Sequence, residues 1–248
     1  GAEVDKADED GRTPLYAACC NIQVDAARLL LDKGADVNRA MKDGATPLFV
    51  ACQDGHVDAA RLLLDKGADV NKADEDGRTL VYMACEKGHV EAARLLLDKG
   101  ADVNRANEKG ATPLFIACWN GHVDTARLLL DKGAEVDRAE KQGATPLYIA
   151  CRKGRVDAAR LLLDNGADVN KAKENGETPL GVAQRKGHAA VVALLEEHHW
   201  RPSSVGRGTS SSTSSKRKST ASGPARGGTA DAMAAMADGE GDEKALRF

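Results

Sequence analysis

Residues 43–75 read DGATPLFVACQDGHVDAARLLLDKGADVNKADE, and close variants of this stretch recur along the chain. Gly44 belongs to a set of six glycines that stand 33 residues apart, the others being Gly11, Gly77, Gly110, Gly143 and Gly176. Five of the six recurrences read G-x-T-P-L, and the third reads GRTLV. A fixed period of this length is typical of a stacked repeat array. Such an array mainly offers a long surface, so the pattern favours binding over catalysis.

Each recurrence predicts a turn followed by two antiparallel helices. Thr46 accepts hydrogen bonds from free amides and Pro47 suits the first helical position, which predicts a first helix over 47–53. A glycine ends that helix, and three consecutive leucines give the second predicted helix, over 57–65, a wide apolar face. Gly67 stands where a left-handed residue would end it. Because neither helix is long enough to be stable alone, the units must stack.

These residues carry a family resemblance. The succession G-x-T-P-L, A-x-x-x-G-H-V and LLL-D-x-GADVN resembles the ankyrin repeat from about Gly1 to His199. The resemblance implies an all-α solenoid of helix-turn-helix units with β-turn fingers. The chain departs from the family in one column. The family usually has His after T-P-L, whereas this chain has Tyr16, Phe49, Tyr82, Phe115, Tyr148 and Gly181 there. We interpret this column as a core ladder, the alternative being a stacking platform for a ligand. The bonding that the family's His makes between repeats is then absent or replaced by aromatic packing.

The period and the composition predict the domain organisation. Residues 1–9 match the end of a repeat and indicate a fragment that begins inside one; the repeats then cover 10–42, 43–75, 76–108, 109–141, 142–174 and 175–200. Residues 201–248 are rich in Ser, Gly and Thr and are expected to be disordered. This tail has a net charge of +3 and the repeats −6. That profile does not suit a general nucleic-acid binder.

The columns of chemically versatile side chains favour structural roles. Five of the six cysteines form one column, and equivalent positions on stacked helices lie about 8–10 Å apart, too far for disulfides or shared zinc. We expect small buried thiols and a reducing compartment, hence an intracellular (cytoplasmic or nuclear) chain. The histidine column, His56, His89, His122 and His188, is expected at turns or caps. We therefore predict no enzyme, cofactor or metal, and no apolar stretch approaches the ~20 residues of a membrane span.

Variation between the repeats marks the expected partner site. Helix two barely varies, whereas the turn tips and the ends of helix one do. In the ankyrin repeats that the chain resembles, these positions line a concave groove. The predicted partner-binding residues are Arg12, Lys42, Asp43, Gln53, Asp54, Arg78, Glu86, Lys87, Trp119, Asn120, Arg152, Lys153, Arg185 and Lys186. The alternative is neutral drift at exposed positions.

Two features sharpen this prediction. Trp119 stands where other repeats place Gln, Glu or Arg, which indicates an exposed binding hot spot. Arg152, Lys153, Arg155, Arg185 and Lys186 make the C-terminal end of the groove basic, which favours an acidic partner. The same cations would also suit ordinary helix ends.

The expected function is a protein-interaction scaffold or adaptor that acts as a monomer. One alternative is the targeting part of a larger enzyme, such as a kinase or ubiquitin ligase. Another is a substrate, because the family's Asn in GADVN can be hydroxylated, which would concern Asn38, Asn71, Asn104 and Asn170. The tail sequence KRK at 216–218, followed by Ser219, suggests a nuclear-import signal or a phosphorylation site.

Two repeats break the pattern. Ile22 replaces the glycine that ends helix one in the first repeat, and we expect it to be strained if it adopts a left-handed conformation. Leu80 replaces the proline of the third repeat, which predicts a locally softer segment over 79–83. The last helix ends the array and is expected to act as a cap.

Overall fold

The computed structural model describes residues 3–200, and side chains through His198; the predicted disordered tail and Ser219 lie outside this part. Within it the chain forms helices joined by turns, without a named β-strand. The helices are α1 (Pro14–Cys20), α2 (Val24–Asp32), α3 (Pro47–Gln53), α4 (Val57–Asp65), α5 (Leu80–Lys87), α6 (Val90–Asp98), α7 (Pro113–Asn120), α8 (Val123–Asp131), α9 (Pro146–Arg152), α10 (Val156–Asp164), α11 (Pro179–Arg185) and α12 (Ala189–Trp200).

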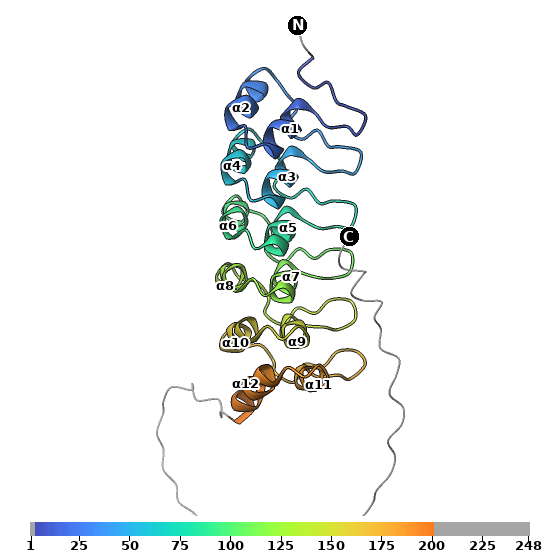
Figure 1. Ribbon diagram of the computed structural model, residues 1–248, viewed down its shortest axis with the longest axis vertical. Coiled ribbons are helices and arrows are strands. Elements are labelled where there is room, and N and C mark those ends of the chain that lie inside the picture. The colour runs from blue at the N-terminus through green and yellow to red at the C-terminus, as the bar shows by residue number, and fades with distance from the viewer. Residues whose placement is uncertain (1–2, 201–248) are drawn as a thin grey trace, which may run out of the picture. The chain divides into compact units, whose positions relative to one another are not determined.

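Consecutive helices pair, and the pairs stack into a solenoid (Figure 1). Odd-numbered helices form one column, even-numbered helices form another, and the turns project from the odd-numbered side. We number the pairs as units 1 to 6 from the N-terminus, each with the turn that precedes its first helix. The all-α solenoid expected from the sequence is confirmed.

Each first helix begins at a threonine cap. The Thr46 hydroxyl accepts a hydrogen bond from the Phe49 amide at 3.2 Å, and the equivalent threonines of the other units do the same. Proline then occupies the first helical position except in α5, which begins at Leu80 under the cap of Thr79. The cap therefore fixes the start of the helix even without proline.

The core follows the predicted columns. Four members of the aromatic column are buried, and Tyr16 in unit 1 is half-buried. The five cysteines of the cysteine column are buried and unpaired, as predicted: Cys19, Cys52, Cys85, Cys118 and Cys151. Burial raises the pKa of the Cys19, Cys52 and Cys151 thiols to about 12. These thiols are therefore small core residues held in the neutral form.

The histidine column connects neighbouring units. His122 stands at the N-cap of α8, but its side chain makes no cap bond there; its Nε2 instead lies 3.1 Å from the Glu86 carbonyl oxygen of the preceding unit. His188 makes the same contact with the Arg152 carbonyl at 3.0 Å. Arg155 takes this position in unit 5 and donates from Nε to the Trp119 carbonyl at 3.3 Å. The predicted turn position is confirmed, and the contact is one between units.

Ion pairs connect the ends of the second helices. Lys66 lies 2.8 Å from Asp32, Lys99 lies 2.9 Å from Asp65, and Lys132 lies 2.7 Å from Asp98. Each pair joins adjacent units across 34 residues of sequence. Hydrogen bonding to the lysine lowers the pKa of each aspartate. All these groups are exposed, so each pair contributes little to stability.

Unit 1 has an uncovered N-terminal side. Leu29 is 60% exposed, whereas its equivalents in later units, such as Leu62 and Leu95, are buried against the preceding unit. Ile22 is 62% exposed and has a φ of 58°, where other units have glycine. The predicted left-handed isoleucine is confirmed.

Candidate partner-binding face

The turns and the ends of the first helices lie on one side of the array. We call five positions of each unit the first-helix face. They are the two residues of the turn tip, the residue after the turn glycine, and the last two residues before the position that follows helix one. That last position is Ile22 in unit 1 and glycine in the other units. In Figure 1 this face includes the column of odd-numbered helices and the projecting turns. All the partner-binding residues predicted from the sequence occupy these positions.

Backbone hydrogen bonds hold the turn tips in register. The Lys42 amide donates to the Asp10 carbonyl at 3.2 Å, and the Glu108 amide donates to Asp76 at 3.0 Å. The same bond joins units 4 and 5 at Lys141 and units 5 and 6 at Glu174. Among the described turn tips this bond is missing between units 2 and 3, so the tips of units 1 and 2 form one fixed group and those of units 3 to 6 another. Fixed tips reduce the ordering cost when a partner binds.

Most of the predicted residues are accessible, with one correction. Trp119 is only 8% exposed, so the prediction of an exposed tryptophan is wrong. Its ring lies 6.4 Å from that of Phe115, and the Lys153 ammonium lies 4.1 Å from the Trp119 ring centroid. The next unit covers the indole because a cation packs favourably on an aromatic face. Trp119 is thus mainly a packing residue, and Lys153 presents the charge above it.

A charged cluster in units 5 and 6 was not predicted. The Tyr148 hydroxyl donates to Glu177 Oε2 at 2.6 Å, and Arg185 Nε donates to Glu177 Oε1 at 2.7 Å. The hydrogen bond from Arg185 lowers the pKa of Glu177, and burial raises that of Tyr148. Glu177 is the one acidic residue in a column that otherwise holds Arg or Ala. That exception is the sequence signal from which this cluster could have been predicted.

The N-terminal half contains a second charged cluster. Arg78 Nε lies 2.7 Å from Asp74 Oδ2, and the Arg78 guanidinium lies 3.6 Å from Asp76. Two carboxylates therefore surround one cation. This part of the first-helix face is acidic despite its arginine.

Asparagines of the GADVN phrase bridge adjacent units. Asn38 Oδ1 accepts from the Asp69 amide, and Asn104 Oδ1 accepts from the Glu135 amide, both at 2.9 Å. Asp5 and Asp137 accept the equivalent bonds. The column therefore has a structural role in joining units, and hydroxylation of Asn38, Asn71, Asn104 or Asn170 remains a prediction.

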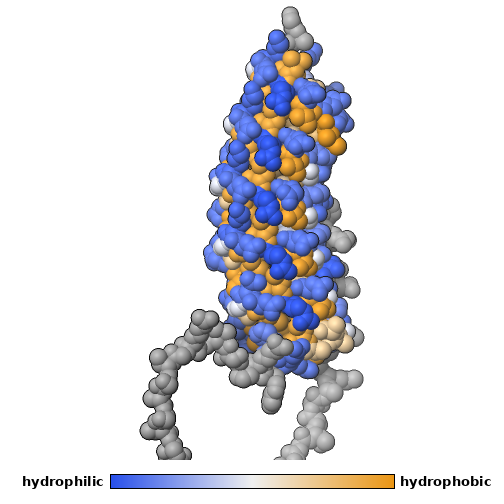
Figure 2. Space-filling model, turned by 90° about the vertical axis from the view of Figure 1, so that its left-hand side faces the viewer, coloured by the Kyte–Doolittle hydropathy of each residue, from blue (hydrophilic) through white to orange (hydrophobic). Residues whose placement is uncertain are grey.

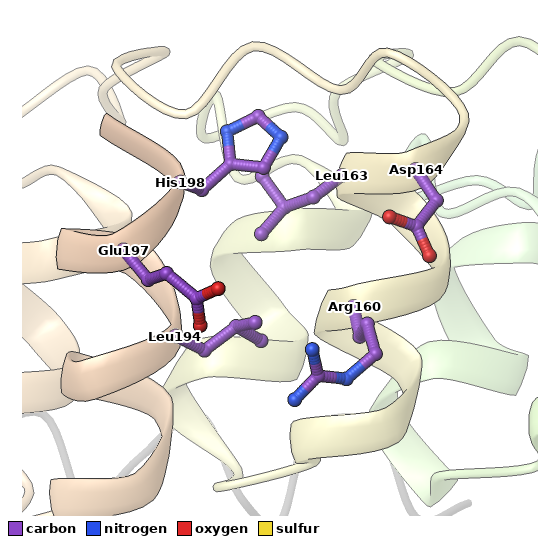
Figure 3. A pocket seen from close by; sticks show the side chains of 6 residues that line it. All are labelled: Arg160, Leu163, Asp164, Leu194, Glu197 and His198. Carbon is purple, nitrogen blue, oxygen red and sulfur yellow. The ribbon is translucent and has the colours of Figure 1, made fainter. Parts of the chain in front are cut away.

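A small cavity lies on the opposite side, between α10 and α12 (Figure 3). Its volume is about 50 Å³, and it is lined by Arg160, Leu163, Asp164, Leu194, Glu197 and His198. Among the described residues, no group of three His, Cys, Asp or Glu side chains could hold a metal ion. The cavity is too small for most organic ligands.

The second-helix side of the array alternates in polarity along its length (Figure 2). Arg61, Arg94 and Arg127 are exposed here, each with an acidic residue three positions before and four positions after it. Because opposite charges repeat in units 1 to 5, this side carries no strong charge of one sign there.

The family comparison agrees with this architecture. The model for ankyrin repeats (3 copies) matches residues 1–74, 71–140 and 133–203. The chain therefore belongs to the ankyrin-repeat family. No curated protein matches its sequence. None of the helices at residues 3–200 has the length and apolar character needed to cross a lipid bilayer.

Proposed function

We propose that this chain is a protein-interaction module that binds a partner protein through the first-helix face. The observation that carries the proposal is the contrast between the two sides of the array. The second-helix side repeats one charge pattern in units 1 to 5, whereas the first-helix face presents a different set of side chains in each unit. A rigid scaffold with variable loop and helix-end residues is suited to selective binding.

The chemistry within the described part supports binding rather than catalysis. The thiols with raised pKa values are poor nucleophiles, and the carboxylates of Asp74 and Glu177 are each engaged by an arginine. A scaffold or adaptor role in a reducing compartment, with a monomeric array, fits these properties. Ankyrin repeats generally act as protein-interaction modules.

A matched pair of variants tests the proposal. The full chain, a face variant with Lys87→Ala, Arg152→Ala and Lys186→Ala, and a control variant with Arg61→Ala, Arg94→Ala and Arg127→Ala are immobilised separately. Each removes three cations, but the control removes them from the second-helix side. Unchanged melting curves are checked first, and proteins captured from a lysate of the native source are then identified by mass spectrometry.

We expect proteins that the parent and the control retain and that the face variant loses. Identical capture by all three would contradict the proposed location. Loss in the control alone would place the binding site on the second-helix side.

A further inference from the structure

The charges of the first-helix face are sorted along the array. In units 1 to 3 the face has seven carboxylates and four cations, a net charge of −3. In units 4 to 6 it has three carboxylates and six cations, a net charge of +3. The acidic half contains Glu9, Asp10, Asp43, Asp54, Glu75, Asp76 and Glu86, and the basic half contains Lys109, Lys141, Arg152, Lys153, Arg185 and Lys186.

Contacts between side chains hold several of these charges in place. In the acidic half, Asp74 lies beside the turn tip and pairs with Arg78, so its charge offsets one of the few cations there. In the basic half, the Lys153 ammonium lies 4.1 Å from the centroid of the Trp119 ring, a contact that fixes the position of this cation. Glu177 pairs with Arg185, while Lys186 at the same helix end is exposed. Side-chain contacts therefore fix the positions of Arg78, Lys153 and Arg185 on this face.

We propose that this face binds an extended bipolar segment of a partner protein. The acidic half of the segment lies over units 4 to 6, and its basic half lies over units 1 to 3. This inference rests on the proposed function and adds the charge order of the partner. A uniformly acidic segment would gain at one half of the face and be repelled at the other.

The stacking distance sets the spacing of the two charged halves. Adjacent packed helices lie about 8–10 Å apart, so the centres of the two halves, three units apart, are separated by roughly 30 Å. An extended chain advances about 3.3 Å per residue, which places the two charge clusters of the partner about nine residues apart. Because both clusters belong to one chain, the second contact forms at high effective concentration.

Synthetic peptides labelled with a fluorophore test the charge order. The bipolar peptide is (KG)₄GG(EG)₄. The mixed peptide has the same composition with Lys and Glu alternating. Two further peptides are (EG)₄ and (KG)₄ extended to equal length with Gly and Ser. Fluorescence anisotropy with the full chain is measured at about 20 mM and about 150 mM salt, because screening weakens exposed charge contacts.

We expect the bipolar peptide to bind at least about tenfold more tightly than the other three at low salt. Arg152→Glu with Lys186→Glu should abolish this preference. Arg61→Glu with Arg127→Glu introduces the same charge change on the second-helix side and should preserve it.

Three results would overturn the inference, and they distinguish its failure from the failure of the proposed function. Equal binding of the mixed and bipolar peptides, lost in the face variant but kept in the control, would refute the charge order while leaving the binding face intact. Peptide binding that is unchanged in the face variant would refute both the charge order and the location of the binding face. Tighter binding of the uniformly acidic peptide would instead indicate a polyanionic partner on the basic half alone.

Discussion

Thr125 is a buried hydroxyl without a hydrogen-bond partner among the described residues. It lies in α8 and is 1% exposed. The equivalent positions of neighbouring units are Ala92 and Ala158, which are buried, and the last unit has Val191. Unit 4 alone therefore buries an unsatisfied polar group in this column.

Replacing Thr125 with Ala should stabilise the array. Removing the unpaired hydroxyl gains about 1–3 kcal/mol. The higher helix propensity of alanine adds about 0.5 kcal/mol. The lost γ-methyl costs about 1 kcal/mol in burial. The expected net gain is about 0.5–2.5 kcal/mol.

Urea denaturation followed by circular dichroism measures this change as a shift of the midpoint. Thr125→Val keeps the shape and removes the hydroxyl, so it should also raise the midpoint. Thr125→Ser keeps the hydroxyl and loses the methyl group, so it should lower it. Repeat arrays can depart from two-state unfolding. The midpoints are therefore compared only between variants whose unfolding transitions have the same dependence on urea concentration as the parent.

A lower midpoint for both Thr125→Ala and Thr125→Val would refute the reasoning. It would mean that the hydroxyl is satisfied in solution, for example by a buried water. Stabilisation by Ala but not by Val would instead point to crowding of the branched side chain as the cause.

Four further predictions follow from single features. Ile22→Gly should raise the free energy of unfolding by up to about 1 kcal/mol, because glycine adopts the left-handed conformation without strain; a lower urea midpoint would contradict this. Trp119→Ala should cost about 3–5 kcal/mol, because it removes a buried aromatic ring; a melting curve like that of the parent would show that the ring is exposed after all. Residues 79–83 should exchange amide hydrogens faster than the equivalent segments of units 2 and 4, since the helix there lacks its proline; equal rates by mass spectrometry would remove this soft segment. The hydrogen bond from Arg185 lowers the pKa of Glu177. Glu177 should therefore contribute to the free energy of unfolding above its unfolded pKa, and this contribution should be lost as the pH falls through the folded pKa. Urea midpoints of Glu177→Gln that fall as steeply in acid as those of the parent would contradict this contribution.

The fold was predictable because its signals are local and repeated. The predicted helices over 47–53 and 57–65 coincide with α3 and α4. A threonine cap, a proline and two glycines fix the ends of these helices within one unit, so no distant contact is needed to locate them.

The candidate site was harder because its geometry depends on contacts between units. The sequence places Trp119 at a variable, partner-facing position, but Lys153 of the next unit covers its ring. The cluster around Glu177 likewise joins residues from units 5 and 6. Periodicity assigns residues to a face, whereas the rotamers and cross-unit pairs that decide exposure require coordinates.

The cysteine column has a practical consequence. Units 1 to 5 each bury a thiol at the same position, from Cys19 to Cys151. A thiol reagent can reach each sulfur only after that unit opens, so the chain has five intrinsic reporters of local unfolding. Peptide mapping of the modified sites over time would rank the opening rates along the solenoid. It would require no engineered label and leave the sequence unaltered.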